Sequence, residues 1–263
     1  MKRIVLYALC MVFAFTGCEN SDKKVTTFSG VDGNSAVVND DNGSEKSNGG
    51  SADGITMDFD DSGLSNDNVV YVGDGEFDYY KYDQAALGNV KVTLSDLPKS
   101  VSDIKKMKLP TGMSDIHDIP YFGPALLVAA LLERDADKEE SKRMINYVAR
   151  SAFDSNQGAA DAYASDWSQI NQYSDLSAVA TYFEGANKGN DYTPSSPITM
   201  NMELTNYSYT ADKDYIRLQI KSSQKSSPQF IMIKMEDKDG DGNYDFFYPT
   251  EFMTLAHSLG VYK

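Results

Sequence analysis

The sequence predicts an α+β fold in which a helical block packs on a curved antiparallel sheet. Three observations support this fold class. Strand-like segments open the folded part, a helical middle contains one stretch that is apolar on all sides, and the last third alternates polar and apolar residues. Such alternation is typical of a sheet with one solvated face and one covered face, and the helices are the expected cover.

The N-terminus has the pattern of an export signal. Lys2 and Arg3 precede the apolar run Ile4 to Phe15, which is twelve residues long and therefore too short to cross a bilayer, since a spanning helix needs about 20 residues. Thr16 and Gly17 then lead into Cys18. We therefore predict a lipoprotein signal peptide at residues 1–17 and acyl chains such as palmitate on Cys18. The alternative is an ordinary signal peptide in which the cysteine is incidental.

The two cysteines limit the chemistry of the mature chain. Cys10 lies inside the signal, and Cys18 is the residue that would be acylated. We therefore expect no disulfide, no cysteine nucleophile and no thiolate metal site after processing.

Residues 18–68 are predicted to form a disordered tether. Gly, Ser, Asn and Asp dominate this segment, and its eleven acidic residues outnumber three lysines. So few large apolar residues cannot offset the entropy lost on folding. We expect residues 69–263 to form a single α+β domain with 19 basic and 28 acidic residues, a balance that argues against nucleic acid as a partner.

The domain should begin with strands and continue with helices. Val69 to Val72, Glu76 to Tyr82 and the alternation from Val90 to Leu94 predict strands. Pro124 fits the first turn of a helix, and the apolar stretch Ala125 to Leu132 predicts that this helix is buried on every side.

Three further helices are predicted. Asp137 with Glu140 has the spacing of a capping box, followed by a helix whose apolar face holds Met144, Ile145, Val148 and Ala152. Ala159 to Tyr173 and a shorter segment, Leu176 to Phe183, predict the other two helices. The last third should form an antiparallel meander with strands at Ile198 to Leu204, Ile216 to Ile220, Phe230 to Met235 and Tyr244 to Tyr248.

Two short motifs resemble a bacterial domain family of unknown function that is common in Gram-positive gut bacteria. One is Pro120-Tyr121-Phe122-Gly123-Pro124-Ala125. The other is Tyr182-Phe183-Glu184-Gly185-Ala186, followed by Asn190-Asp191-Tyr192-Thr193-Pro194. The resemblance covers roughly residues 118–263 and implies no activity or catalytic residue.

The acidic segment near the C-terminus is a candidate calcium loop. Its ligands would be Asp237, Asp239, Asp241, Asn243 and Asp245, with Gly242 at the reversal. Ca²⁺ is bound by six to eight oxygens from flexible loops. The position at which an EF-hand carries glutamate holds Tyr248, and strands are predicted on both sides, so the pattern resembles Asp-rich loops set between strands. The alternative is a hairpin turn without an ion, because Asp-Gly-Asn sequences also favour turns.

Several weaker candidates stay open. Asp115, His117 and Asp118 could form a metal or acid–base site, although a loop feature is the simpler interpretation. His257 is expected to be a partly buried structural residue. Glu184 is the first choice for a carboxylate of catalysis, against a structural role at a helix end, and clusters of tyrosine could contact sugars or peptides.

The sequence therefore favours a membrane-anchored envelope lipoprotein on the extracytoplasmic side, most simply a non-catalytic binding or interaction module with a structural calcium ion. The alternative is an envelope hydrolase that uses two carboxylates to cleave glycans, since no nucleophile motif is present. The ligand or protein partner cannot be named from the sequence.

Overall fold

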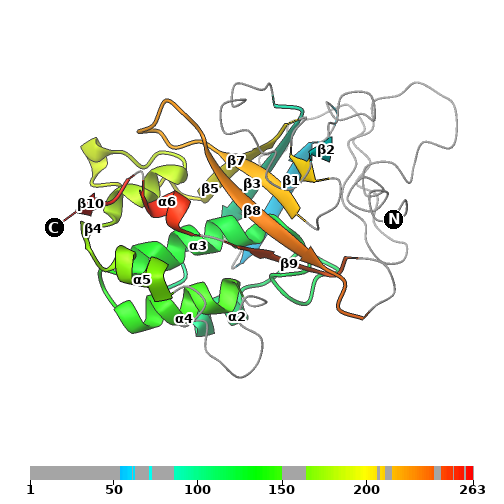
Figure 1. Cartoon of the computed structure of the whole chain (residues 1–263), viewed down its shortest axis with the longest axis horizontal. Helices are drawn as coiled ribbons and strands as arrows, with labels where there is room; N and C mark the ends of the chain where they lie inside the picture. The colour runs from blue at the N-terminus through cyan, green and yellow to red at the C-terminus, as the bar shows by residue number, and fades with distance from the viewer. Residues whose placement is uncertain are drawn as a thin grey trace, which may run out of the picture.

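The structure is a computed structural model and describes residues 54–60, 62, 71–72, 86–149, 164–205, 208–210, 215–239, 244–250, 252–257 and 259–262. It confirms the α+β fold (Figure 1). A curled antiparallel sheet curves over helices, which gather along its lower side in this view. In these described ranges, no helix is both long enough and apolar enough to cross a bilayer.

Six antiparallel strands form the sheet. They are β1 (Ile55–Asp60), β3 (Gly88–Leu94), β5 (Ile198–Leu204), β7 (Tyr215–Ile220), β8 (Gln229–Glu236) and β9 (Phe246–Pro249), paired in that order. The short strands β6 (Tyr209–Thr210) and β2 (Tyr71–Val72) extend it beside β7. A separate small sheet joins β4 (Tyr173–Asp175) to β10 (Val261–Tyr262).

Strand β1 corrects the predicted domain boundary. Residues 55–60 were assigned to the tether, but they pair with β3 along their whole length, and Ile55 is fully buried. Ile55, Met57 and Phe59 alternate with Thr56, Asp58 and Asp60, as a half-buried strand requires. The boundary at residue 68 was therefore too late. The strand predicted at Glu76 to Tyr82 lies outside the described residues.

The helices largely follow the prediction. They are α2 (Val101–Lys106), α3 (Phe122–Glu133), α4 (Lys138–Val148), α5 (Ala164–Ile170) and α6 (Met253–His257), with 3-10 turns η2 (Ser177–Tyr182) and η3 (Lys188–Asn190). The Asp137 side chain accepts hydrogen bonds from the backbone N–H of Glu139 and Glu140, which confirms the predicted start of α4. The segment Leu176 to Phe183 is a 3-10 helix, and α5 is described only from Ala164.

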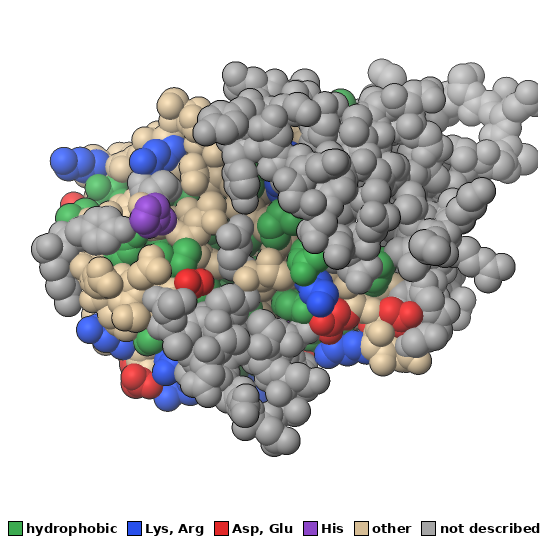
Figure 2. Space-filling model, viewed as in Figure 1, with side chains coloured by type: hydrophobic (Ala, Val, Ile, Leu, Met, Phe, Trp, Pro, Cys, Tyr) green, Lys and Arg blue, Asp and Glu red, His purple; other side chains and the backbone are tan. Residues whose placement is uncertain are grey.

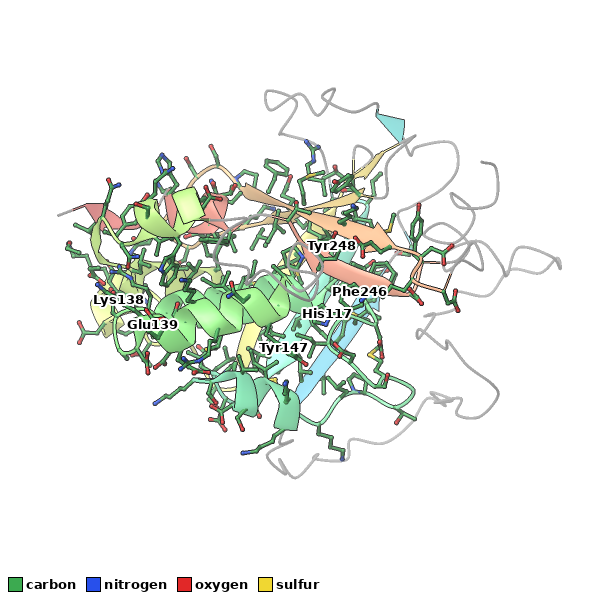
Figure 3. The ribbon with its side chains drawn as sticks, turned by 60° about the horizontal axis from the view of Figure 1, so that its bottom comes forward. His117, Lys138, Glu139, Tyr147, Phe246 and Tyr248 are labelled. Carbon is green, nitrogen blue, oxygen red and sulfur yellow. The ribbon has the colours of Figure 1, made fainter. Side chains whose placement is uncertain are left out.

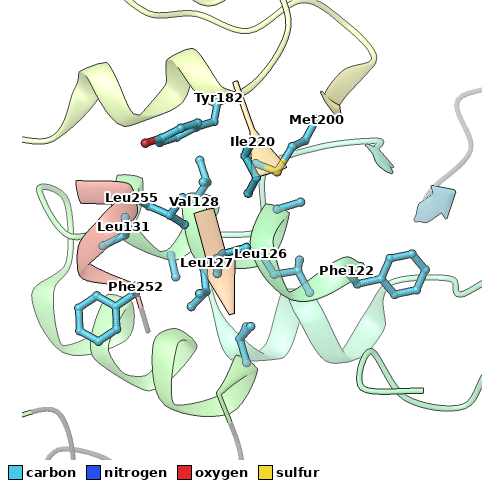
Figure 4. Packing of buried hydrophobic residues seen from close by; sticks show 14 of the residues in the cluster. Phe122, Leu126, Leu127, Val128, Leu131, Tyr182, Met200, Ile220, Phe252 and Leu255 are labelled. Atoms are coloured by element: carbon cyan, nitrogen blue, oxygen red, sulfur yellow. The ribbon is translucent and has the colours of Figure 1, made fainter. Parts of the chain in front are cut away.

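Helix α3 forms the centre of the core (Figure 4). Its residues from Phe122 to Leu131 are all buried, as the apolar stretch predicted. The sheet contributes Met200 and Ile220 to this core, and α6 contributes Leu255 to the same cluster. Ser141 Oγ donates a 2.6 Å hydrogen bond to the carbonyl of Ala130, which holds α4 against α3. With this face covered, the opposite face of the sheet carries the polar side chains.

Candidate functional site

The polar face of the sheet is built from rows of side chains that cross several strands. Alternation places Asn89, Lys91 and Thr93 of β3 on this face. The strand register sets Asp58 and Asn201 on either side of Lys91, and it sets Asp60 and Glu203 on either side of Asn89. Directly opposed side chains on adjacent strands lie about 5 Å apart. Polar groups from three strands therefore form a continuous surface.

A groove of about 1470 Å³ lies over these rows. One wall is the end of η2 with the residues that follow it, and Ser222 and Ser223 after β7 stand beside that wall. Ser222 Oγ lies 2.7 Å from Thr181 Oγ1, and Ser223 Oγ donates a 2.8 Å hydrogen bond to the carbonyl of Ala186. The wall is thus tied to the end of β7 by side-chain hydrogen bonds.

Glu184 is held in the groove by its backbone. Its N–H donates to the carbonyl of Thr199 and its carbonyl accepts from the N–H of Ser195, both at 2.8 Å. Its Oε1 accepts a 2.5 Å hydrogen bond from Asn201 Nδ2. The helix-end position expected for Glu184 is confirmed, since it follows Phe183 at the end of η2 and precedes the turn at Gly185, and its side chain lies beside the polar face of the sheet.

Glu203 forms the second fixed carboxylate. Its two oxygens accept hydrogen bonds from Gln219 Nε2 at 2.7 Å and Lys221 Nζ at 2.6 Å. Gln219 is only 4 % exposed, and in the part of the chain that the structure describes its Oε1 has no hydrogen-bond donor. A buried acceptor without a donor costs about 1–3 kcal/mol. Gln219 lines the groove, so this buried, unsatisfied acceptor belongs to its wall.

The charge of the groove is negative. Its lining holds the carboxylates of Asp58, Asp60, Glu184 and Glu203 against the ammonium groups of Lys91 and Lys221, a net charge of −2. The Ser62 N–H donates a 3.0 Å hydrogen bond to Asp60 Oδ1, and hydrogen bonds from Ser62 lower the pKa of the Asp60 carboxyl. Asp60 therefore stays ionised and is a poor general acid.

A second cluster surrounds His117, which is 1 % exposed (Figure 3). Its Nδ1 contacts the Asp115 carboxylate, and its Nε2 lies 2.9 Å from the carbonyl of Val148 at the end of α4. The ring stacks on Phe246 of β9 with centroids 4.5 Å apart. The loop position expected for His117 is confirmed, but its burial was not foreseen. With both nitrogens engaged, it is a structural junction between α4 and β9.

The predicted calcium loop is described only in part. Asp237, Asp239 and Asp245 flank the turn between β8 and β9, while Asp241 and Asn243 lie outside the described residues. Asp245 Oδ1 accepts a 2.9 Å hydrogen bond from the N–H of Lys238, which closes this end of the hairpin. Within the described ranges, no three His, Cys, Asp or Glu side chains are grouped so that they could hold a metal ion.

The remaining sequence candidates are dispersed. His257 is exposed instead of partly buried, and its Nδ1 lies 3.0 Å from the hydroxyl of Tyr173. Asp118 accepts hydrogen bonds from the backbone of Ser114 and Asp115, a loop role. Cys18 and the tyrosines near residue 80 lie outside the described residues.

Charged side chains show no gathering of one sign on the described part of the face in Figure 2, where both signs are scattered among apolar groups. The lining of the groove is drawn from four strands and the η2 wall. The sequence does not predict the rows on β1 and β3, because residues 55–60 fall within the predicted tether.

Comparison with protein families matches residues 96–255 to the model described as Domain of unknown function (DUF6935). Neither the curated proteins nor the solved structures compared with this chain produced a match. The matched range includes Glu184, Glu203 and Gln219, whereas β1 and β3 lie before it. The groove is thus shared between the matched domain and the strands that precede it.

Proposed function

The chain belongs to the DUF6935 family, a domain of unknown function, and we propose that it is a non-catalytic binding module held at the cell envelope, with its ligand in the polar groove. One observation carries this proposal. The groove combines fixed carboxylates with the buried, unsatisfied Oε1 of Gln219. Binding sites place a few polar groups in fixed positions in this way to orient a ligand.

The arrangement of the carboxylates favours binding over hydrolysis. A glycosidase needs one carboxyl group that is protonated and can serve as an acid. The lowered pKa of Asp60 keeps that group ionised, and both oxygens of Glu203 accept hydrogen bonds, from Gln219 and from Lys221. Polar rows that accept and donate hydrogen bonds suit a hydroxyl-rich ligand such as a saccharide.

A groove-filling variant tests the proposal. Asn201 is exposed at the centre of the polar face, so Asn201→Arg should fold while its long side chain occupies the groove. Full-length protein in detergent should be retarded in gels that contain soluble polysaccharides, and the variant should lose that retardation for every polysaccharide that binds. Gln169→Arg, on the exposed face of α5, is the matched control and should bind normally.

Two results would contradict a binding module. One is equal retardation of Asn201→Arg and the parent protein. The other is release of reducing ends from a bound polysaccharide, which would favour the carboxylate hydrolase.

The proposed location depends on Cys18. The basic start, the short apolar run and the small residues before the cysteine support a lipid anchor. Cys18→Ser should move the protein from the membrane fraction to the soluble fraction of lysed cells. Cys10→Ser, inside the signal, should leave it in the membrane fraction. Membrane retention of Cys18→Ser would contradict the anchor.

We also propose that the acidic loop holds a structural calcium ion. The five oxygen-bearing residues between β8 and β9 support it, and the ion would brace the hairpin that carries Phe246 against His117. At a Ca²⁺ concentration about 100-fold above Kd, binding to the folded state adds about 2.7 kcal/mol to stability, or roughly 5–10 °C in Tm. Thermal melts in Ca²⁺ and in EDTA measure this shift. Asp239→Asn should reduce it, and equal melting temperatures in both buffers would contradict the site.

A further inference from the structure

We infer that the ligand of the polar groove is an oligosaccharide that carries free amino groups. This inference rests on the proposed binding function and names its ligand class. It depends on three properties of the groove: which hydrogen-bonding groups remain available, what charge it has, and which kinds of polymer its walls can accept.

The groove offers more charged acceptors than charged donors, because its lining holds four carboxylates against two ammonium groups, and several of its donors already point at these carboxylates. The Asn201 amide donates to Glu184, while the Gln219 amide and the Lys221 ammonium donate to Glu203. Among the described residues, the acceptors open to a ligand are the second oxygen of Glu184 and the exposed carboxylates of Asp58 and Asp60, while the unsatisfied Oε1 of Gln219 is buried behind them in the wall. A ligand that fits must therefore be rich in donors.

The charge selects among donor-rich ligands. Hydroxyl groups donate hydrogen bonds, but they do not compensate a net charge of −2. Ammonium groups do both, and a hydrogen bond between ions is roughly twice as strong as one between neutral groups. Lys91 stands between Asp58 and Asn201, so neighbouring positions also provide a donor for a hydroxyl oxygen. The combination fits a molecule with hydroxyl and amino groups on one ring.

The sheet favours a saccharide over a peptide. Peptides bind to sheets through main-chain hydrogen bonds at a free strand edge. Along the floor of the groove, β3 and β5 are each paired on both sides, so the floor offers no main-chain edge, and only β1 lies at the edge of the sheet. Recognition must use side chains standing on the face, where neighbouring strands lie about 4.8 Å apart. A volume of about 1470 Å³ exceeds the range of roughly 300–1,000 Å³ usual for small-molecule sites, which favours an oligomer.

Matched ligands test the inference with the full-length protein in detergent. The probes are the hexamer of glucosamine, the hexamer of N-acetylglucosamine and spermine, measured by titration calorimetry at low salt, where charge interactions are least screened. The glucosamine hexamer should bind at least tenfold more tightly than the acetylated hexamer. It should also bind more tightly than spermine, which has amines without hydroxyl groups.

Two variants assign the binding to the groove. Glu184→Gln keeps the shape of the side chain and removes its charge, so the affinity for the glucosamine hexamer should fall about tenfold. Glu139→Gln makes the same change at an exposed position in the first turn of α4, at the end opposite the His117 cluster in Figure 3, and should have no effect. Circular dichroism melts of both variants confirm that they fold.

Each contrary result has a distinct meaning. Equal affinity for the two hexamers would overturn the amino-group requirement but leave the binding function standing. Equal binding of spermine, with the same loss in Glu184→Gln, would reduce the groove to a site for cations and overturn the saccharide. Binding by neither hexamer nor by any polysaccharide in the gels would overturn the inference and the proposed function together.

Discussion

Replacing His117 with alanine should lower the free energy of unfolding by about 3 kcal/mol. The substitution removes a buried ring, which leaves a cavity beside Phe246, and it removes the donor to the Val148 carbonyl at the end of α4. Large-to-small substitutions in a core cost about 2–5 kcal/mol, and a buried acceptor that loses its donor adds about 1–3 kcal/mol. Because the loop around His117 can relax partly into the cavity, we expect a loss of stability near the lower end of the combined range.

Chemical denaturation of the full-length chain in detergent measures this loss. His257 provides the control, because it is the only other histidine and it is exposed. His257→Ala removes one hydrogen bond, to the Tyr173 hydroxyl, so its cost should stay below about 1 kcal/mol. If the two substitutions cost the same, His117 would not be the junction between α4 and β9 that its contacts indicate.

The main elements of the fold could be predicted because their signals are local. The apolar run of α3, the cap at Asp137 and the alternation along β5 are visible in any window of a few residues. Helix α2 was missed because six residues carry too little periodicity, although Ser100 caps it. Strand β1 was missed because the polar composition around it outweighed an alternation only six residues long.

The candidate site was less predictable because it depends on register. The motif Tyr182 to Ala186 indicated Glu184 as a candidate, but its hydrogen-bond partner Asn201 is seventeen positions away in the sequence. Asp58 and Lys91 become neighbours only through the pairing of β1 with β3, which a single sequence does not reveal. The burial of His117 also depends on distant residues, Val148 and Phe246, while its local sequence is that of a polar turn.

Replacing Gly185 with alanine should lower the free energy of unfolding by about 3 kcal/mol and should also disturb the groove. Gly185 has φ +81°, a conformation that costs other residues about 1–3 kcal/mol. A Cβ at this position would overlap Ser195 Oγ and lie 2.9 Å from Ser195 Cβ. The backbone must therefore move, and overpacking of this kind adds about 1–3 kcal/mol.

The movement should reach Glu184, whose carbonyl accepts the hydrogen bond from the Ser195 N–H. Gly189→Ala is the matched control in the same loop, because Gly189 does not have a positive φ and its added Cβ would meet only Asn187 Oδ1, at 3.0 Å. The cost of Gly189→Ala should stay below about 1 kcal/mol, with polysaccharide binding unchanged.

Denaturation and gel retardation together separate the effect of Gly185→Ala on stability from its effect on binding. If Gly185→Ala weakens binding while the protein is still fully folded, then Gly185 contributes to the groove by fixing the backbone of Glu184. If binding falls only in proportion to the unfolded fraction, its role is confined to stability and the carboxylate does not depend on this turn for its position.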